Sequence, residues 1–139
     1  VYGGIAVLAA IYTCAGLSKL LSMGPAWANP FGLRAMVGVY MPPIIEGHGT
    51  AFVSQWFLHG PPWVATVLAA TTLILEAGAI AMCLSARVRS IWALGLVAMH
   101  ISIWLLTGGA IGYGSSIVLL LVFCIPWGTE VIPKSGFEQ

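Results

Sequence analysis

The sequence predicts an all-α integral membrane protein, a bundle of four transmembrane helices with one or two short re-entrant or interfacial helices. Of the 139 residues, 60% are hydrophobic and only 6% are charged, whereas a soluble domain carries roughly 25% charged residues. Long apolar runs recur along the chain, and about 20 such residues cross a bilayer as a helix. The six Trp residues also suit membrane interfaces. The net charge of +1 gives no indication of nucleic-acid binding.

A single transmembrane domain is expected over residues 1–130, followed by a polar tail at 131–139. The first span is predicted at 2–21, since this run is just long enough for the ~30 Å hydrocarbon core. Residues 22–60 hold several prolines between apolar pieces that are too short to span, so they are predicted to form an outer interfacial region. The start at Val1 has no basic region or cleavage site typical of a signal peptide, and further helices are conceivable before it.

Three more spans are predicted at 62–84, 90–107 and 110–125. Proline opens the first of these, where its missing N–H costs nothing because it would be unpaired there anyway, and a glycine pair separates the last two. The short loop 85–90 contains two arginines, so the positive-inside rule places it in the cytoplasm. The expected location is therefore the bacterial inner (plasma) membrane, with residues 22–60 facing outside.

Two ionisable side chains lie inside these spans, and such groups are costly at membrane depth unless they form a site or a polar contact. Glu76 either hydrogen-bonds to another helix and holds the bundle together, or handles protons or binds a substrate. Thr72, one turn earlier, offers it a polar partner on its own face. His100 is likewise a candidate proton donor, ligand or buried hydrogen-bond partner.

Lys19 closes the first span, where a long side chain can reach the interface. Alternatively, Lys19 is a candidate catalytic residue that acts as a base. In the outer region, Glu46 and His48 form an EGHG segment that, with His59, has the chemistry to hold a metal or a lipid headgroup. No metal site is predicted, because His100 has no second ligand one turn away.

Several motifs occur in a fixed order along the chain. The run IYTCAGLSKL at 11–20 ends a helix in Ala-Gly-Leu-Ser-Lys-Leu, and FVSQWFLHGPP at 52–62 precedes the next span. An acid, an arginine and a histidine then follow at Glu76, Arg89 and His100. The order and spacing resemble the HTTM (horizontally transferred transmembrane) superfamily, in particular the transmembrane domain of vitamin K-dependent gamma-carboxylases. The resemblance continues through a glycine-broken turn, Tyr113 and the FCIP run at 123–126.

A rival resemblance is to the DoxX-like family of small four-helix membrane proteins. These proteins share the Ala-Gly-x-x-Lys-Leu end of a first helix and a later glutamate. They do not require a histidine in the third span, and their glycine-rich loop before the arginine is absent here.

The carboxylase resemblance implies a chemistry, because in that family a lysine deprotonates reduced vitamin K. Lys19 would then be the base, with Glu76 and His100 in structural or proton-handling roles. The cofactor would be a quinone or a vitamin K-like lipid. The alternative is a non-catalytic accessory subunit of a larger membrane complex, which packs on its partners and stabilises them or lines a lipid or quinone path. Whether the protein is an enzyme stays open at this point, and its expected partners are the lipid bilayer and other membrane protein subunits.

Overall fold

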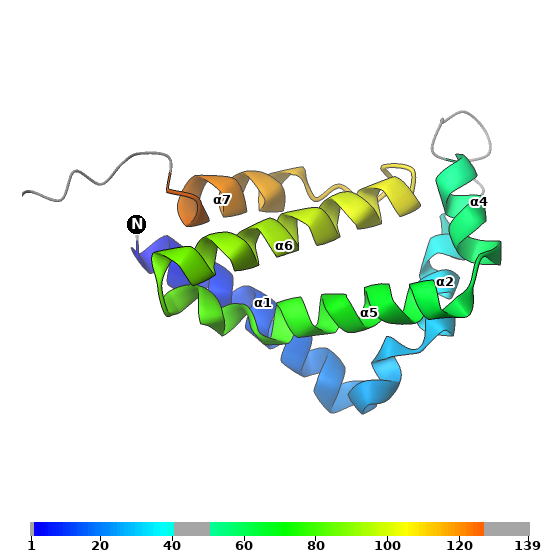
Figure 1. The fold of residues 1–139 in the computed structure, drawn as a ribbon, viewed down its shortest axis with the longest axis horizontal. Coiled ribbons are helices and arrows are strands. Elements are labelled where there is room, and N and C mark those ends of the chain that lie inside the picture. The colour runs from blue at the N-terminus through cyan, green and yellow to red at the C-terminus, as the bar shows by residue number, and fades with distance from the viewer. Residues whose placement is uncertain (1, 41–50, 127–139) are drawn as a thin grey trace, which may run out of the picture.

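The computed structural model describes residues 2–40 and 51–126, and these residues form helices and turns without a strand (Figure 1). The prediction of an all-α protein is therefore confirmed for this part of the chain. The elements in order are α1 (Tyr2–Met23), the 3-10 helix η1 (Gly24–Ala28), α2 (Pro30–Val39), α4 (Ala51–His59), α5 (Pro62–Ala77), the 3-10 helix η2 (Ala79–Cys83), α6 (Ala86–Leu106) and α7 (Gly114–Cys124).

Local sequence signals explain most of the helix ends. Gly24 ends α1 with a positive φ of 59°, a conformation that glycine adopts without strain, and the proline after it cannot continue the helix. Asn29 caps α2 by accepting a hydrogen bond from the backbone N–H of Phe31. Ser85 caps α6 in the same way, since its side chain accepts from Val88 N at 3.2 Å.

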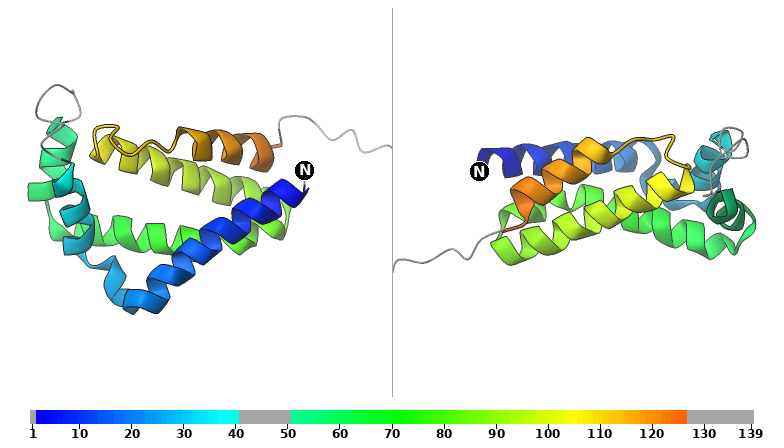
Figure 2. Two further views of the ribbon diagram at one scale, coloured as in Figure 1. Left: turned by 180° about the vertical axis from the view of Figure 1, so that it is seen from behind. Right: turned by 90° about the horizontal axis from the view of Figure 1, so that it is seen from above.

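The helices form a wedge. α5 and α6 are joined by η2 at one end and spread apart toward the other end, where α2 and α4 lie across them (Figures 1 and 2). α1 packs against α5 and η2, and α7 packs along α6. Two hydrophobic cores fill this arrangement. The larger core lies among α1, η2, α6 and α7, and the smaller one is built by Val37, Phe57, Ala65 and Leu106 at the wide end of the wedge.

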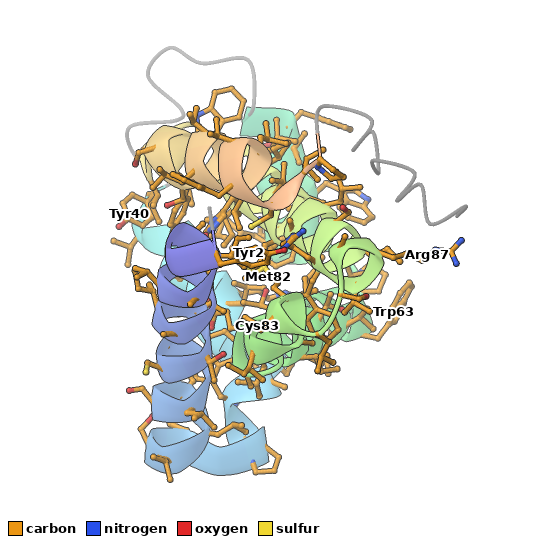
Figure 3. All side chains as sticks on the ribbon, turned by 90° about the vertical axis from the view of Figure 1, so that its left-hand side faces the viewer. Tyr2, Tyr40, Trp63, Met82, Cys83 and Arg87 are labelled. Carbon is orange, nitrogen blue, oxygen red and sulfur yellow. The ribbon has the colours of Figure 1, made fainter. Side chains whose placement is uncertain are left out.

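Much of the apolar surface points outward. Leu21 is 88% exposed and Ile74 is 64% exposed, whereas Met82 in the larger core is fully buried. Figure 3 shows Met82 inside the bundle and Arg87 projecting away from it. Apolar side chains around the whole circumference of a helix are typical of a lipid environment.

Two of the described helical segments are long and apolar enough to cross a membrane. One is α1 together with η1, and the other is α6. The count rises to three if α4 and α5, which meet at a bend of 104°, form one broken span. The predicted second span at 62–84 changes at Gly78 from α-helix to 3-10 helix, and the predicted fourth span contains an α-helix of only 11 residues. A bundle of four spans therefore stays a prediction.

Candidate functional site

The candidate site begins with the close crossing of α1 and α5 at Gly16. A Cβ atom at this position would lie 2.6 Å from the Cα of Ala77, which is closer than real Cβ contacts occur. Only glycine allows the two backbones to approach this far, as small residues do at helix interfaces in membranes. One turn farther along α1, the crossing brings the side chain of Lys19 beside the last turn of α5.

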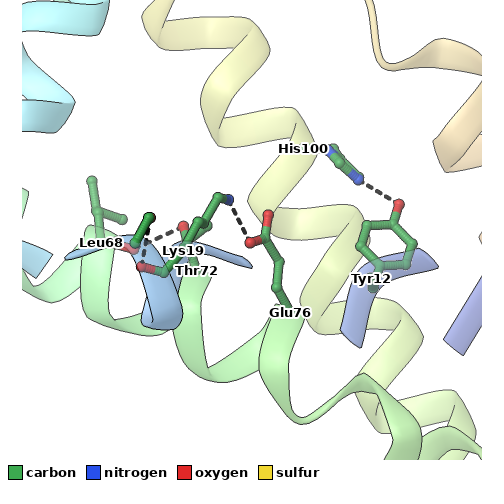
Figure 4. Close-up of polar contacts among 7 residues, drawn as sticks. Tyr12, Lys19, Leu68, Thr72, Glu76 and His100 are labelled. Carbon is green, nitrogen blue, oxygen red and sulfur yellow. Dashed lines mark hydrogen bonds and ion pairs between the residues drawn. The ribbon is translucent and has the colours of Figure 1, made fainter. Parts of the chain in front are cut away.

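Lys19 and Glu76 form an ion pair across this crossing. The Lys19 ammonium donates to Oε2 of the Glu76 carboxylate, and the two side chains are 28% and 10% exposed (Figure 4). The ammonium also lies 4.6 Å from the ring centroid of Trp27, close enough for an attractive cation–π contact. A paired lysine and glutamate place no net charge in the apolar bundle, which removes most of the cost of burying either one alone.

A second polar contact lies two turns back along α1. The Tyr12 hydroxyl and Nε2 of His100 are 2.6 Å apart (Figure 4). The Tyr113 ring stacks on the His100 imidazole with centroids 4.3 Å apart. His100 is only 4% exposed, and its Nδ1 has no hydrogen-bond partner among the described residues. The imidazole thus retains one buried polar atom.

Both contacts use a side chain of α1 (Figure 4). Tyr12, Gly16 and Lys19 follow one another at i, i+4 and i+7, so they share a face of α1. A single polar region therefore extends through the bundle, with members from α1, α5, α6 and the turn before α7.

A cavity of about 310 Å³ opens beside this region, between α5 and α6. Thr72 and Leu75 line it from α5 next to Glu76, and Leu33 of α2 closes it at the wide end of the wedge. Thr71 and Ala98 at its rim are exposed, so the cavity opens to the surface of the molecule. Its walls are mostly apolar, with a few hydroxyl groups, which is the usual make-up of a small-molecule site.

The structure brings together the three residues that the sequence singled out, Lys19, Glu76 and His100. It differs from expectation in their partners. Thr72 donates to the backbone carbonyl of Leu68 at 2.9 Å, and Glu76 pairs with Lys19 instead. His100 pairs with Tyr12, a residue the sequence reasoning did not select.

The remaining candidates are the histidines and the glutamate of the predicted outer region. His59 lies in the last turn of α4 and is exposed, while Glu46 and His48 are outside the described residues. Within 2–40 and 51–126, no group of three or more His, Cys, Asp or Glu side chains is placed to hold a metal ion. Comparisons with protein-family models, curated proteins and solved structures gave no match to this chain.

Proposed function

We propose that this protein is an integral membrane protein that binds a lipid-soluble, quinone-like molecule in the α5/α6 cavity and handles a proton of that molecule at the Lys19–Glu76 pair. The observation that carries the proposal is a paired lysine and glutamate one turn along α5 from Thr72, a wall of an apolar cavity of about 310 Å³. The proposal agrees with the resemblance to the HTTM superfamily, which implies a base that acts on a reduced quinone.

Two of the three hydroxyl groups that line the cavity, those of Thr72 and Ser102, favour a ligand that donates hydrogen bonds. Thr72 donates its hydroxyl hydrogen to Leu68 O at 2.9 Å, and Ser102 donates to Ala98 O at 2.8 Å. Each hydroxyl has a single hydrogen, so what remains on both oxygens is acceptor capacity. A ring that carries an O–H, as a quinol does, complements these oxygens better than a ring that carries only carbonyls.

The ion pair suggests a division of roles that differs from the one suggested by the sequence. The Lys19 ammonium already donates to Glu76, so the carboxylate is the group able to accept a proton from a ring hydroxyl. The O–H bond breaks, the proton moves to a Glu76 oxygen, and the ammonium of Lys19 stabilises the oxygen anion that is left. The step is a proton transfer alone, and preorganised charge in a site of low dielectric is well suited to it.

The first test measures binding of a hydroxynaphthoquinone, whose absorption changes when its ring hydroxyl loses the proton, to the protein in lipid nanodiscs. We expect the bound probe to lose its proton at a lower pH than the free probe. Lys19→Met should weaken binding of the anion by about ten- to a hundredfold, because a charge-assisted contact is worth roughly 1.5–3 kcal/mol. Arg87→Met, which removes an exposed cation pointing away from the bundle, is the matched control.

The accessory-subunit alternative is tested on the native protein. Purification in mild detergent, with mass spectrometry of proteins and lipid-soluble molecules, would find stoichiometric large partners and no bound ring compound if that alternative holds. That result, or a probe that titrates in the protein as it does in free solution, would overturn the proposal.

A further inference from the structure

A second cavity of about 210 Å³ lies on the other side of the ion pair. It is bounded by the end of α1, by η1 and by α2, and the side chains of Met23, Trp27 and Met36 are among its walls. Met23 is 59% exposed, so this cavity reaches the outer surface of the bundle. Methionine side chains adapt readily to irregular apolar shapes, and flexible chains are suitable occupants of such a space.

The two cavities meet at Leu33. This side chain lines both of them and is half-buried against the smaller core. The ion pair lies near both cavities. The Lys19 ammonium contacts the ring of Trp27, a wall of the second cavity, and Glu76 follows Leu75, a wall of the first, along α5.

We propose that the two cavities are the two halves of one bent site, and that the ligand carries a flexible apolar tail that runs past Leu33 into the cavity under Trp27. The ring occupies the α5/α6 cavity, and a tail longer than the second cavity leaves the protein beside Met23. Leu33 then determines which tails are accepted. The inference rests on the proposed function, since it extends the ligand of that same site.

The test compares two probes, a decyl-substituted benzoquinol and the same ring without the decyl chain. Leu33→Trp should fill the passage and lower the affinity of the tailed probe relative to that of the bare ring by about tenfold, equivalent to losing the burial of one or two methylenes. Because Leu33 also lines the ring's cavity, the ratio of the two affinities is the readout. Val39→Trp places the same side chain at an exposed position of the same helix and should leave both affinities unchanged. Ratios between variants in one detergent cancel the partitioning of the tail into micelles.

Leu33→Ala provides a second readout, which holds even if the tryptophan variant does not fold. It widens the passage, so the affinity of the tailed probe relative to the bare ring should rise by about threefold or change its dependence on tail length. Both probes could bind the natural protein with neither variant changing the ratio of their affinities. The tail would then leave directly between Thr71 and Ala98, and this inference would be wrong while the proposed function stands. If neither probe binds the natural protein, the proposed function fails and the bent site fails with it.

Discussion

The two cores of the bundle use polar side chains in different ways. In the smaller core at the wide end of the wedge, polar side chains bond to the backbone at helix ends. Ser54 donates to the carbonyl of Leu106 at 2.8 Å, and Arg34 donates to the carbonyl of Gly60 at the bend before α5. In the larger core and at its edge, two bonds join side chain to side chain, Tyr12 to His100 and Lys19 to Glu76. They occur beside a bond to the backbone, from Trp92 Nε1 to the carbonyl of Leu75 at 2.8 Å.

This difference distinguishes polar side chains that hold the fold together from polar side chains that are available for chemistry. A side chain that bonds to the carbonyl at a helix end satisfies a backbone group left over by the helix, and the fold needs it there. A lysine paired with a glutamate serves no backbone group, and an apolar pair of similar volume is often equally stable. The larger core is therefore where a ligand-directed function is expected, and substitutions can test the contrast.

The largest effect is expected from Glu76→Leu. This variant leaves the Lys19 ammonium without its carboxylate partner, and breaking a buried ion pair typically costs about 3–5 kcal/mol. The double variant Lys19→Met with Glu76→Leu should recover most of that loss, because neither charge remains. Unfolding of both variants in detergent micelles, followed by circular dichroism, measures the two values. If the double variant is as unstable as the single one, the pair is required for the fold, and the contrast between the cores disappears.

A smaller effect is expected from Gly16→Ala at the crossing of α1 and α5. The added methyl group would meet the backbone of Ala77 and Glu76, and overpacking of this kind costs about 1–3 kcal/mol. The crossing would open, so binding of the hydroxynaphthoquinone should also weaken. Gly3→Ala is the matched control, since a Cβ there meets nothing within 4 Å and alanine favours a helix by about 0.5–1 kcal/mol. Equal stability of the two variants would contradict the close crossing.

The smallest effect is expected from Ser54→Ala in the smaller core. Loss of its bond to Leu106 O should lower the free energy of unfolding by about 1 kcal/mol and leave probe binding unchanged. Ser18→Ala, at an exposed position of α1, should change neither quantity. If Ser54→Ala is fully folded and still loses probe binding, the two cores are not functionally distinct.

The sequence was sufficient where the signals are local. The first predicted span, 2–21, agrees with α1 at Tyr2–Met23, and the scarcity of charge predicts the outward-facing apolar surface. The predicted loop at 85–90 was wrong, because α6 already begins at Ala86 after its cap Ser85. Partners across the bundle were not predictable in this way. Lys19 and Glu76 are 57 positions apart, and Tyr12 and His100 are 88 apart, so their pairing depends on how α1 crosses α5 and α6. The signal that was available is the shared face of Tyr12, Gly16 and Lys19 on α1.

The separation of the paired charges along the chain also bears on how the protein is made. As a nascent chain, α1 would reach the membrane long before α5 has been synthesised, and a lysine at the centre of a helix costs roughly 2.5–3.5 kcal/mol on insertion scales. Position 19 lies near the end of α1 rather than at its centre, so its ammonium can remain among the lipid headgroups until the glutamate arrives. For a chain that inserts into a membrane as proposed, we expect the Lys19–Glu76 pair to form only once α5 has been synthesised.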